Sequence, residues 1–382
     1  MKKVKGILYS DHRKVVIAIR DGRIAKIERG GTAEEGDDVY IAPAFIDNQI
    51  NGYLGTEFSD PDLTTEEMVR IVRVLRSKGV VTFFPTVITA SQESLIRSFR
   101  NLSGSLENDE VASSVPGFHL EGPYISPEDG YRGAHSREHV RKPDWDEFRR
   151  LNDAAGGRIV QVTLAPEVEG AEDFIKKCAG EGIVVALGHH NGSAEDIRRA
   201  VDAGARTVTH LGNGMANHIH RFNNPLWMQL AEDRLMSSLI LDSFHLPPEM
   251  VTVFYRAKGS ERIILTSDMT MLAGMPPGKY IWDGKEVRLT DEGIILLEQE
   301  NCFAGASLPL HVGVGNMMRF TGCSMKEVVE MATKNPAGLY GLDDRGTIEE
   351  GKRADLVLFT LEEGRLNIRG TIAAGESVSG GK

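Results

Sequence analysis

The sequence has few of the residues that mark several common classes of protein. Its 382 residues include only three cysteines, Cys178, Cys302 and Cys323. Their odd number and wide separation predict neither a disulfide framework nor a CxxC metal site, so we expect buried thiols. No apolar run has the length of a membrane span, and none follows the lysines of residues 1–10 as in a signal peptide. We therefore expect a cytoplasmic protein with no membrane partner.

Positive charge is also scarce in this chain. Its 44 lysines and arginines are outnumbered by 55 aspartates and glutamates, which gives a formal net charge of −11. A nucleic acid partner favours a basic surface, so we expect none here. Hydrophobic residues make up 41% and charged residues 26% of the sequence, which is enough apolar material for a sizeable core and excludes a disordered chain.

Both ends of the chain have the pattern of short β-strands. Residues 3–43 alternate apolar and polar positions in short segments separated by Gly-containing turns such as Asp21-Gly22. The sequence after Gly346 has the same pattern. Chain ends often lie close together in a folded protein. We therefore predict a small β-sandwich domain built from residues 1–43 and 346–382, with a second domain over residues 44–345.

The middle of the chain alternates strand and helix patterns. Thr64-x-x-Glu67 predicts a capping box at the start of one helix. Strand patterns begin near residues 41, 80, 116, 159, 183, 206, 237 and 262. Eight strands separated mostly by helices predict a (β/α)₈ TIM-type barrel, and a doubly wound open sheet is the competing architecture. The hairpin pattern near residues 272–306 predicts a β insertion near the barrel mouth.

Three potential metal ligands follow predicted strands. Glu121 follows VPGFHL, His189 follows IVVALG and His210 follows RTVT. A barrel brings the carboxyl ends of its strands together around one mouth, so these side chains should converge. Two imidazoles and a carboxylate form a zinc-type set that leaves a position open for water. Each residue alone has a structural alternative, as a hydrogen-bonded core group, but together they favour a metal site.

Two further strand ends and one loop carry groups that can act on a substrate. Asp268 closes RIILTS and can act as general base and then general acid, although a helix N-cap is the alternative. His245 closes SSLILDSF and can polarise a carbonyl, or be a simple turn residue. Arg221, with backbone N–H groups near Asn213 and Gly214, is a candidate phosphate site, unless it is a plain surface arginine.

A series of motifs between residues 41 and 359 resembles, in the same order, the motifs of one family. APAFIDNQINGYLG, GFHLEGPYIS, GAHS, LAPE, ALGHHN, THLGNGM, DSFHL, LTSDM, FAGASL and ATKNPAGLYGLDDRGTIEEGKRADLVLF are similar to motifs of N-acetylglucosamine-6-phosphate deacetylases of the amidohydrolase superfamily. The resemblance implies that Glu121, His189 and His210 bind the metal and that Asp268 is the catalytic acid and base. It also implies a substrate site formed by Ala134, His135, Asn213, Gly214, Arg221, His245, Phe303, Ala304 and Gly305.

The chain departs from the superfamily pattern in its first barrel motif. His-x-His, which binds a second metal, is replaced here by Gln49 and Asn51. The resemblance therefore implies one divalent metal per subunit, with zinc as the first choice and iron, cobalt or manganese as alternatives. DSFH stands in place of DG-x-H. Members of the family are typically homodimers, in which a neighbouring subunit can take part in phosphate binding.

These observations predict a metal-dependent deacetylase. The expected reaction converts N-acetylglucosamine 6-phosphate to glucosamine 6-phosphate and acetate. N-acetylgalactosamine 6-phosphate is the alternative substrate, and a dipeptidase, cyclic amidase or deaminase is the alternative activity. A catalytically silent barrel scaffold is the alternative from a different class, because His-x-His is lost, but the retained Asp268 and full ligand set oppose it.

Overall fold

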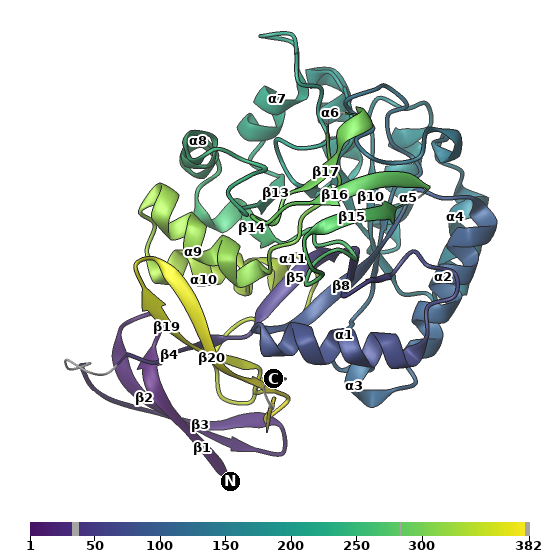
Figure 1. The fold of residues 1–382 in the computed structure, drawn as a ribbon. Helices are drawn as coiled ribbons and strands as arrows, with labels where there is room; N and C mark the ends of the chain where they lie inside the picture. The colour runs from purple at the N-terminus through teal and green to yellow at the C-terminus, as the bar shows by residue number, and fades with distance from the viewer. Residues whose placement is uncertain (33–37, 283, 301, 379–382) are drawn as a thin grey trace.

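The protein consists of a parallel β-barrel surrounded by helices and a separate sheet formed by both ends of the chain (Figure 1). This computed structural model describes residues 1–32, 38–282, 284–300 and 302–378. Each barrel strand pairs in parallel with the next along the chain. The strands are β5 (Phe45–Ile50), β8 (Val80–Ile88), β9 (Phe118–Glu121), β10 (Ile159–Leu164), β11 (Val184–Leu187), β12 (Thr207–Val208), β13 (Met236–Ile240) and β14 (Ile263–Thr266).

The barrel closes between its first and last strands. Ile50 and Met269 form a parallel bridge, and the backbone N–H of Asp268 donates to the Gln49 carbonyl at 3.0 Å. Closure places all eight carboxyl ends around one mouth, so the predicted barrel is confirmed and the open sheet is excluded.

Helices cover the outside of the barrel, and their starts follow the sequence signals. The predicted capping box is present, since Thr64 and Glu67 exchange hydrogen bonds at the start of α1. Among the described residues, no helix is both long and apolar enough to cross a membrane. The helices are α1 (Thr65–Ser77), α2 (Gln92–Ser105), α3 (Asp109–Ala112), α4 (Trp145–Ala154), α5 (Ala171–Gly180), α6 (Ala194–Ala203), α7 (Pro225–Ala231), α8 (Pro248–Lys258), α9 (Leu310–Thr321), α10 (Met325–Met331) and α11 (Lys334–Leu339).

The two chain ends form one β unit, as predicted, and its strands belong to one seven-stranded sheet. Its order is β21-β20-β19-β4-β1-β2-β3, in which β19 pairs antiparallel with β4 (Figure 1). The strands are β1 (Lys2–Leu8), β2 (Arg13–Arg20), β3 (Arg23–Thr32), β4 (Tyr40–Pro43), β19 (Leu356–Glu362), β20 (Arg365–Ala373) and β21 (Glu376–Ser377). The last four residues of the predicted terminal unit, 379–382, lie outside the described residues.

One strand prediction was wrong in its position. The strand near residue 41 is β4 of the terminal sheet, and the first barrel strand begins only at Phe45. The run YIAPAFI is apolar throughout, so its hydrophobic pattern does not mark where the chain passes from one sheet to the other. Pro43 supplies the break, because proline has no N–H with which to extend the first ladder.

The predicted β insertion is a separate antiparallel sheet after β14. Its strands β15–β17 lie in front of the barrel in Figure 1 and pack through a small apolar cluster that includes Leu272, Leu297 and Ala304. The strands are β15 (Gly278–Trp282), β16 (Lys285–Leu289), β17 (Ile295–Leu297) and β18 (Cys302–Phe303). Two-stranded β6 (Gly52–Tyr53) and β7 (Thr56–Glu57) extend the loop after β5.

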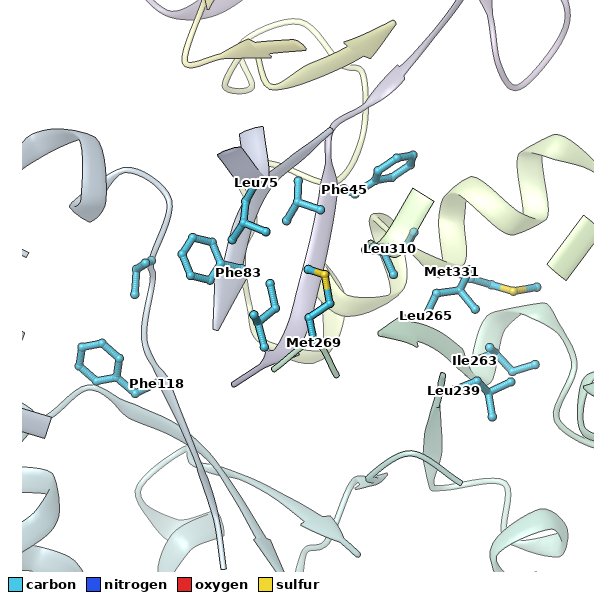
Figure 2. Close-up of a cluster of buried hydrophobic side chains, with 14 of the residues drawn as sticks. Phe45, Leu75, Phe83, Phe118, Leu239, Ile263, Leu265, Met269, Leu310 and Met331 are labelled. Atoms are coloured by element: carbon cyan, nitrogen blue, oxygen red, sulfur yellow. The ribbon is translucent and has the colours of Figure 1, made fainter. Parts of the chain in front are cut away.

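The main core lies between the barrel strands and their surrounding helices. Figure 2 shows Leu75 of α1 beside Phe83 of β8, and Leu310 of α9 belongs to the same buried cluster. Phe83 is fully buried and its ring lies 6.0 Å from that of Phe58. Because these side chains are buried and closely packed, the barrel is a rigid frame for the groups at its mouth.

Phe83→Ala is expected to lower the free energy of unfolding by about 3–5 kcal/mol, because it leaves a cavity in this core. Val253→Ala on α8 is the control, since Val253 is 50% exposed and should change stability by less than about 0.5 kcal/mol. Denaturant unfolding of both variants measures the difference, and equal effects would contradict the assignment of Phe83 to the core.

Candidate metal centre

Glu121, His189 and His210 meet at the barrel mouth, as the sequence predicted. Glu121 is the last residue of β9, and the two histidines each follow a strand by two residues, after β11 and β12. Glu121 Oε1 lies 3.2 Å from His210 Nε2 and 3.4 Å from His189 Nε2, and the two Nε2 atoms are 3.0 Å apart. All three residues are buried. The arrangement therefore directs one carboxylate oxygen and two imidazole nitrogens at a single point.

The main chain and its neighbours orient the two histidines. His189 Nδ1 lies 3.1 Å from the carbonyl oxygen of Tyr131, so Nδ1 carries the proton and the Nε2 lone pair faces the cluster. The backbone N–H of His210 donates to Ser238 Oγ at 2.8 Å. His189, His210 and Asp268 have φ values of 52°, 32° and 52°, in the left-handed region that residues other than glycine rarely adopt. Such strain is typical of functional sites.

The chemistry of this donor set fits a divalent metal ion. Burial alone would raise the pKa of Glu121, but its contacts with the imidazoles of His189 and His210 hold it well below its ordinary value. Two imidazoles and an ionised carboxylate match the three protein ligands of an open catalytic site. Within the described part of the chain, these three residues form the group of ligand-type side chains whose donor atoms all lie within 4.8 Å of one another.

Two amides connect this cluster to Asp268. Gln49 Nε2 donates to Glu121 Oε1 at 2.9 Å and to Asp268 Oδ1 at 3.0 Å, while Asn51 Nδ2 donates to the same Oδ1 at 2.7 Å. Burial raises the pKa of Asp268 to about 6, and the negative charge of Glu121 adds to this effect. A carboxylate in that range can both take and release a proton near neutral pH.

A cavity of about 1060 Å³ lies over the cluster. Of the predicted substrate residues, seven line it: Ala134, His135, Asn213, Gly214, His245, Phe303 and Gly305. Ala304 is instead buried in the apolar cluster of the insertion. The strands β15–β18 contribute Trp282, Arg288 and Leu297 to the wall, so the insertion narrows the mouth of the barrel.

Arg221 lies away from the lining of this cavity. It is exposed in the loop before α7, where its guanidinium lies over the Phe222 ring at 4.5 Å. Its carbonyl oxygen accepts a hydrogen bond from Trp227 Nε1 at 2.8 Å. Phe222 and Trp227 are 72% and 53% exposed, so the loop presents an arginine and two aromatic rings to its surroundings.

The structure also reveals contacts that sequence reasoning missed. His135 Nε2 lies 3.3 Å from His189 Nε2, which places a third imidazole beside the cluster. Asp242 lies 2.7 Å from His245 Nδ1, through Oδ2. His245 does not end a strand as predicted, because β13 ends at Ile240 and His245 lies in the turn that follows. An aspartate three residues before this histidine is the signal that could have suggested the pair. His190 lies outside the group of three ligands, and its Nδ1 accepts a hydrogen bond from the Gly192 N–H at 3.1 Å.

Comparison with known proteins agrees with this geometry. Residues 40–378 match the Amidohydrolase family. The chain belongs to the amidohydrolase family. An N-acetylglucosamine-6-phosphate deacetylase from Lysinibacillus sphaericus is 30% identical over 92% of each chain. An N-acetylgalactosamine-6-phosphate deacetylase from Escherichia coli O157:H7 is 31% identical over 91% of this chain and 90% of its own.

A solved structure extends the likeness to the fold of this amidohydrolase. It is an aspartate-to-alanine mutant of the N-acetyl-D-glucosamine-6-phosphate deacetylase from Mycobacterium smegmatis, in complex with N-acetyl-D-glucosamine-6-phosphate. That structure is 27% identical, has a TM-score of 0.87, and covers 98% of this chain and 99% of its own. Amidohydrolases of this family depend on a metal, and the cluster of Glu121, His189 and His210 can bind one.

Proposed function

We propose that this amidohydrolase removes the acetyl group from N-acetylglucosamine 6-phosphate and releases glucosamine 6-phosphate and acetate. The observation that carries the proposal is the buried Asp268 beside a three-ligand metal cluster, at the floor of a cavity. The groups around Asp268 are those expected for hydrolysis of an amide. Relatives that match this chain over most of its length are deacetylases of phosphorylated N-acetyl sugars.

Asp268 is placed to move the proton that the reaction requires. A divalent ion held by Glu121, His189 and His210 would supply Lewis-acid polarisation and lower the pKa of water. Asp268 accepts a proton as the oxygen of water bonds to the acetyl carbon, and it returns that proton to the sugar nitrogen as the C–N bond breaks. Water thus supplies the new acetate oxygen and the new amine hydrogen, so the atoms balance.

The acetyl carbonyl needs a hydrogen-bond donor during this step. His245 is the residue that the strand-end pattern favours for this role, and it lines the cavity. His135 is a second candidate because its Nε2 lies beside the cluster, 3.3 Å from His189 Nε2. We propose that one of these two imidazoles donates a hydrogen bond to the acetyl carbonyl, and that the other binds a different oxygen of the substrate.

Zinc is our first choice for the metal, with iron, cobalt and manganese as alternatives, because imidazole and carboxylate ligands suit all four. We further propose that the protein acts as a cytoplasmic homodimer with no nucleic acid or membrane partner. The excess of acidic residues supports the absence of nucleic acid, and the exposed Phe222 and Trp227 support an interface between subunits.

We propose that Arg221 binds the phosphate of a substrate in the neighbouring subunit. The Arg221→Ala variant is expected to raise KM for the phosphorylated sugar by about 10-fold or more, since a charge-assisted contact is lost. Activity on unphosphorylated N-acetylglucosamine should change little. Arg100→Ala is the control, because Arg100 is an exposed arginine on α2. Equal losses on both sugars would contradict the phosphate role.

The proposed reaction is tested by measuring free amine released from the two 6-phosphates, N-acetylglucosamine and N-acetylgalactosamine, with the metal content measured alongside. Turnover of the first sugar in a metal-dependent manner supports the proposal. Preference for the second sugar would make N-acetylgalactosamine 6-phosphate the substrate. The Escherichia coli relative, which is named as a deacetylase of that sugar, makes this a specific alternative. Release from a dipeptide or a cyclic amide, without release from either sugar, would overturn it.

A further inference from the structure

A short turn after β13 holds His245 through its side chain and its backbone together. Asp242 Oδ2 lies 2.7 Å from His245 Nδ1, while Asp242 Oδ1 accepts the backbone N–H groups of Phe244 and His245, each at 2.9 Å. The side chains of Asp242 and His245 are only 5% and 7% exposed. One carboxylate therefore closes the turn and fixes the imidazole that the turn presents.

The bond to Asp242 determines which ring nitrogen of His245 meets a ligand. A carboxylate at Nδ1 holds the proton there, so Nε2 is the nitrogen left for the cavity that His245 lines. The same carboxylate stabilises a positive charge on the ring when Nε2 donates a hydrogen bond to a substrate oxygen. The Phe303 ring limits rotation on another side, with its centroid 5.0 Å from that of His245.

The turn adopts a conformation that needs support from outside. Ser243 has φ +78°, in the left-handed region where glycine is favoured. Asn316, a buried residue of α9, donates through Nδ2 to Ser243 Oγ at 2.9 Å and to the Leu241 carbonyl at 2.7 Å. Arg319, one helical turn later, adds a contact to Ser243 Oγ at 3.4 Å. Helix α9 thus anchors the strained residue and the chain just before it.

We propose that Asp242 and Asn316 are positioning residues: Asp242 sets the tautomer and direction of His245, and Asn316 fixes the strained turn that carries both. The proposal rests on the proposed function for the identity of the substrate oxygen that His245 meets. It goes beyond that function by assigning roles to two residues that are not among those that line the cavity.

The first experiment uses Asp242→Asn in the metal-loaded protein. This variant keeps the shape of the side chain but is expected to lower kcat/KM by about 10²-fold, the scale of a misplaced reacting group. In a His245→Gln background the same change should cost almost nothing, because its effect passes through His245. The ¹⁵N resonances of labelled histidine, with those of His245 identified by their loss in His245→Gln, should show a changed tautomer in Asp242→Asn.

The second experiment compares Asn316→Ala with a matched control, Asn335→Ala. Asn335 of α11 also donates twice through Nδ2, to the carbonyls of Ser260 and Ile263 at 2.8 and 2.7 Å, but at the opposite end of the barrel. Both variants should lower Tm to a similar extent. Only Asn316→Ala should lower kcat/KM, by about 10-fold or more, and alter the His245 resonances.

Three results would overturn the positioning role: unchanged His245 resonances in Asp242→Asn, an undiminished effect of that change in the His245→Gln background, or equal activity losses in the two asparagine variants. The histidine resonances need no substrate. If the wild-type protein hydrolyses no phosphorylated N-acetyl sugar, the proposed function fails on its own, while the resonances of the variants still decide whether Asp242 and Asn316 orient His245.

Discussion

Replacing Asp268 by asparagine is expected to lower kcat by at least about 10²-fold, the scale of a lost general acid and base. Asparagine has the same shape, and its amide oxygen can still accept the hydrogen bonds that Gln49 and Asn51 now donate to Oδ1. It cannot take a proton from water or return one to the leaving amine. The fold and the metal content should therefore stay as in the wild type. Steady-state kinetics, thermal unfolding and elemental analysis measure the three quantities.

The matched control for this variant is Asp47→Asn. Asp47 is also a fully buried aspartate of the barrel, and burial raises its pKa to about 6. Its Oδ1 accepts hydrogen bonds from Thr266 Oγ1 at 2.9 Å and from the Ser267 N–H at 3.1 Å, so its bonds serve the closure of β5 against β14. Asp47→Asn should lower Tm while kcat stays within a few-fold of normal. Near-normal turnover in Asp268→Asn would reject the proton-transfer role.

The barrel and its metal cluster could be predicted because the same rule governs both. Glu121, His189 and His210 follow apolar strand patterns, and parallel strands in a barrel end at one mouth. Their positions in the sequence therefore predict that the three side chains meet. The first strand was misplaced because its apolar pattern continues through two sheets, and periodicity cannot mark the crossing between them.

Contacts between distant segments could not be predicted in this way. Asn316 contacts the turn of Ser243 across 73 residues, and no local pattern marks an asparagine on a buried helix face as a partner of that turn. The position of Arg221 was equally hidden, because a loop rich in polar residues has no period that fixes its direction. Its residue type suggested an anion, and only the fold places it outside the cavity of its own chain.

The second large effect concerns the metal. Removing it with a chelator is expected to lower kcat by at least about 10³-fold, since Lewis-acid assistance contributes several kcal/mol. His210→Asn should produce a comparable loss and a protein that no longer retains the ion on dialysis, because two of three ligands remain. Zinc added back should restore the chelated wild type and not the variant. Full activity without metal would reject the proposed chemistry.

The number of ions follows from the contacts of Gln49 and Asn51. Gln49 Nε2 lies between Glu121 Oε1 and Asp268 Oδ1, at 2.9 and 3.0 Å, and Asn51 Nδ2 also donates to Asp268. Both amides therefore present N–H groups, and not lone pairs, to the two carboxylates. Neutral amides also bind zinc far more weakly than imidazole does. One tightly bound metal per chain is therefore expected.

Elemental analysis of active, metal-saturated protein tests this stoichiometry directly, and two tightly held equivalents per subunit would force a mechanism with two metals. The double variant Gln49→His with Asn51→His provides the converse test. It replaces both donor amides by imidazoles that can turn a lone pair toward the same place, so its metal content should rise toward two equivalents. If the content of the double variant stays at one, the two amides are not what limits the number of ions.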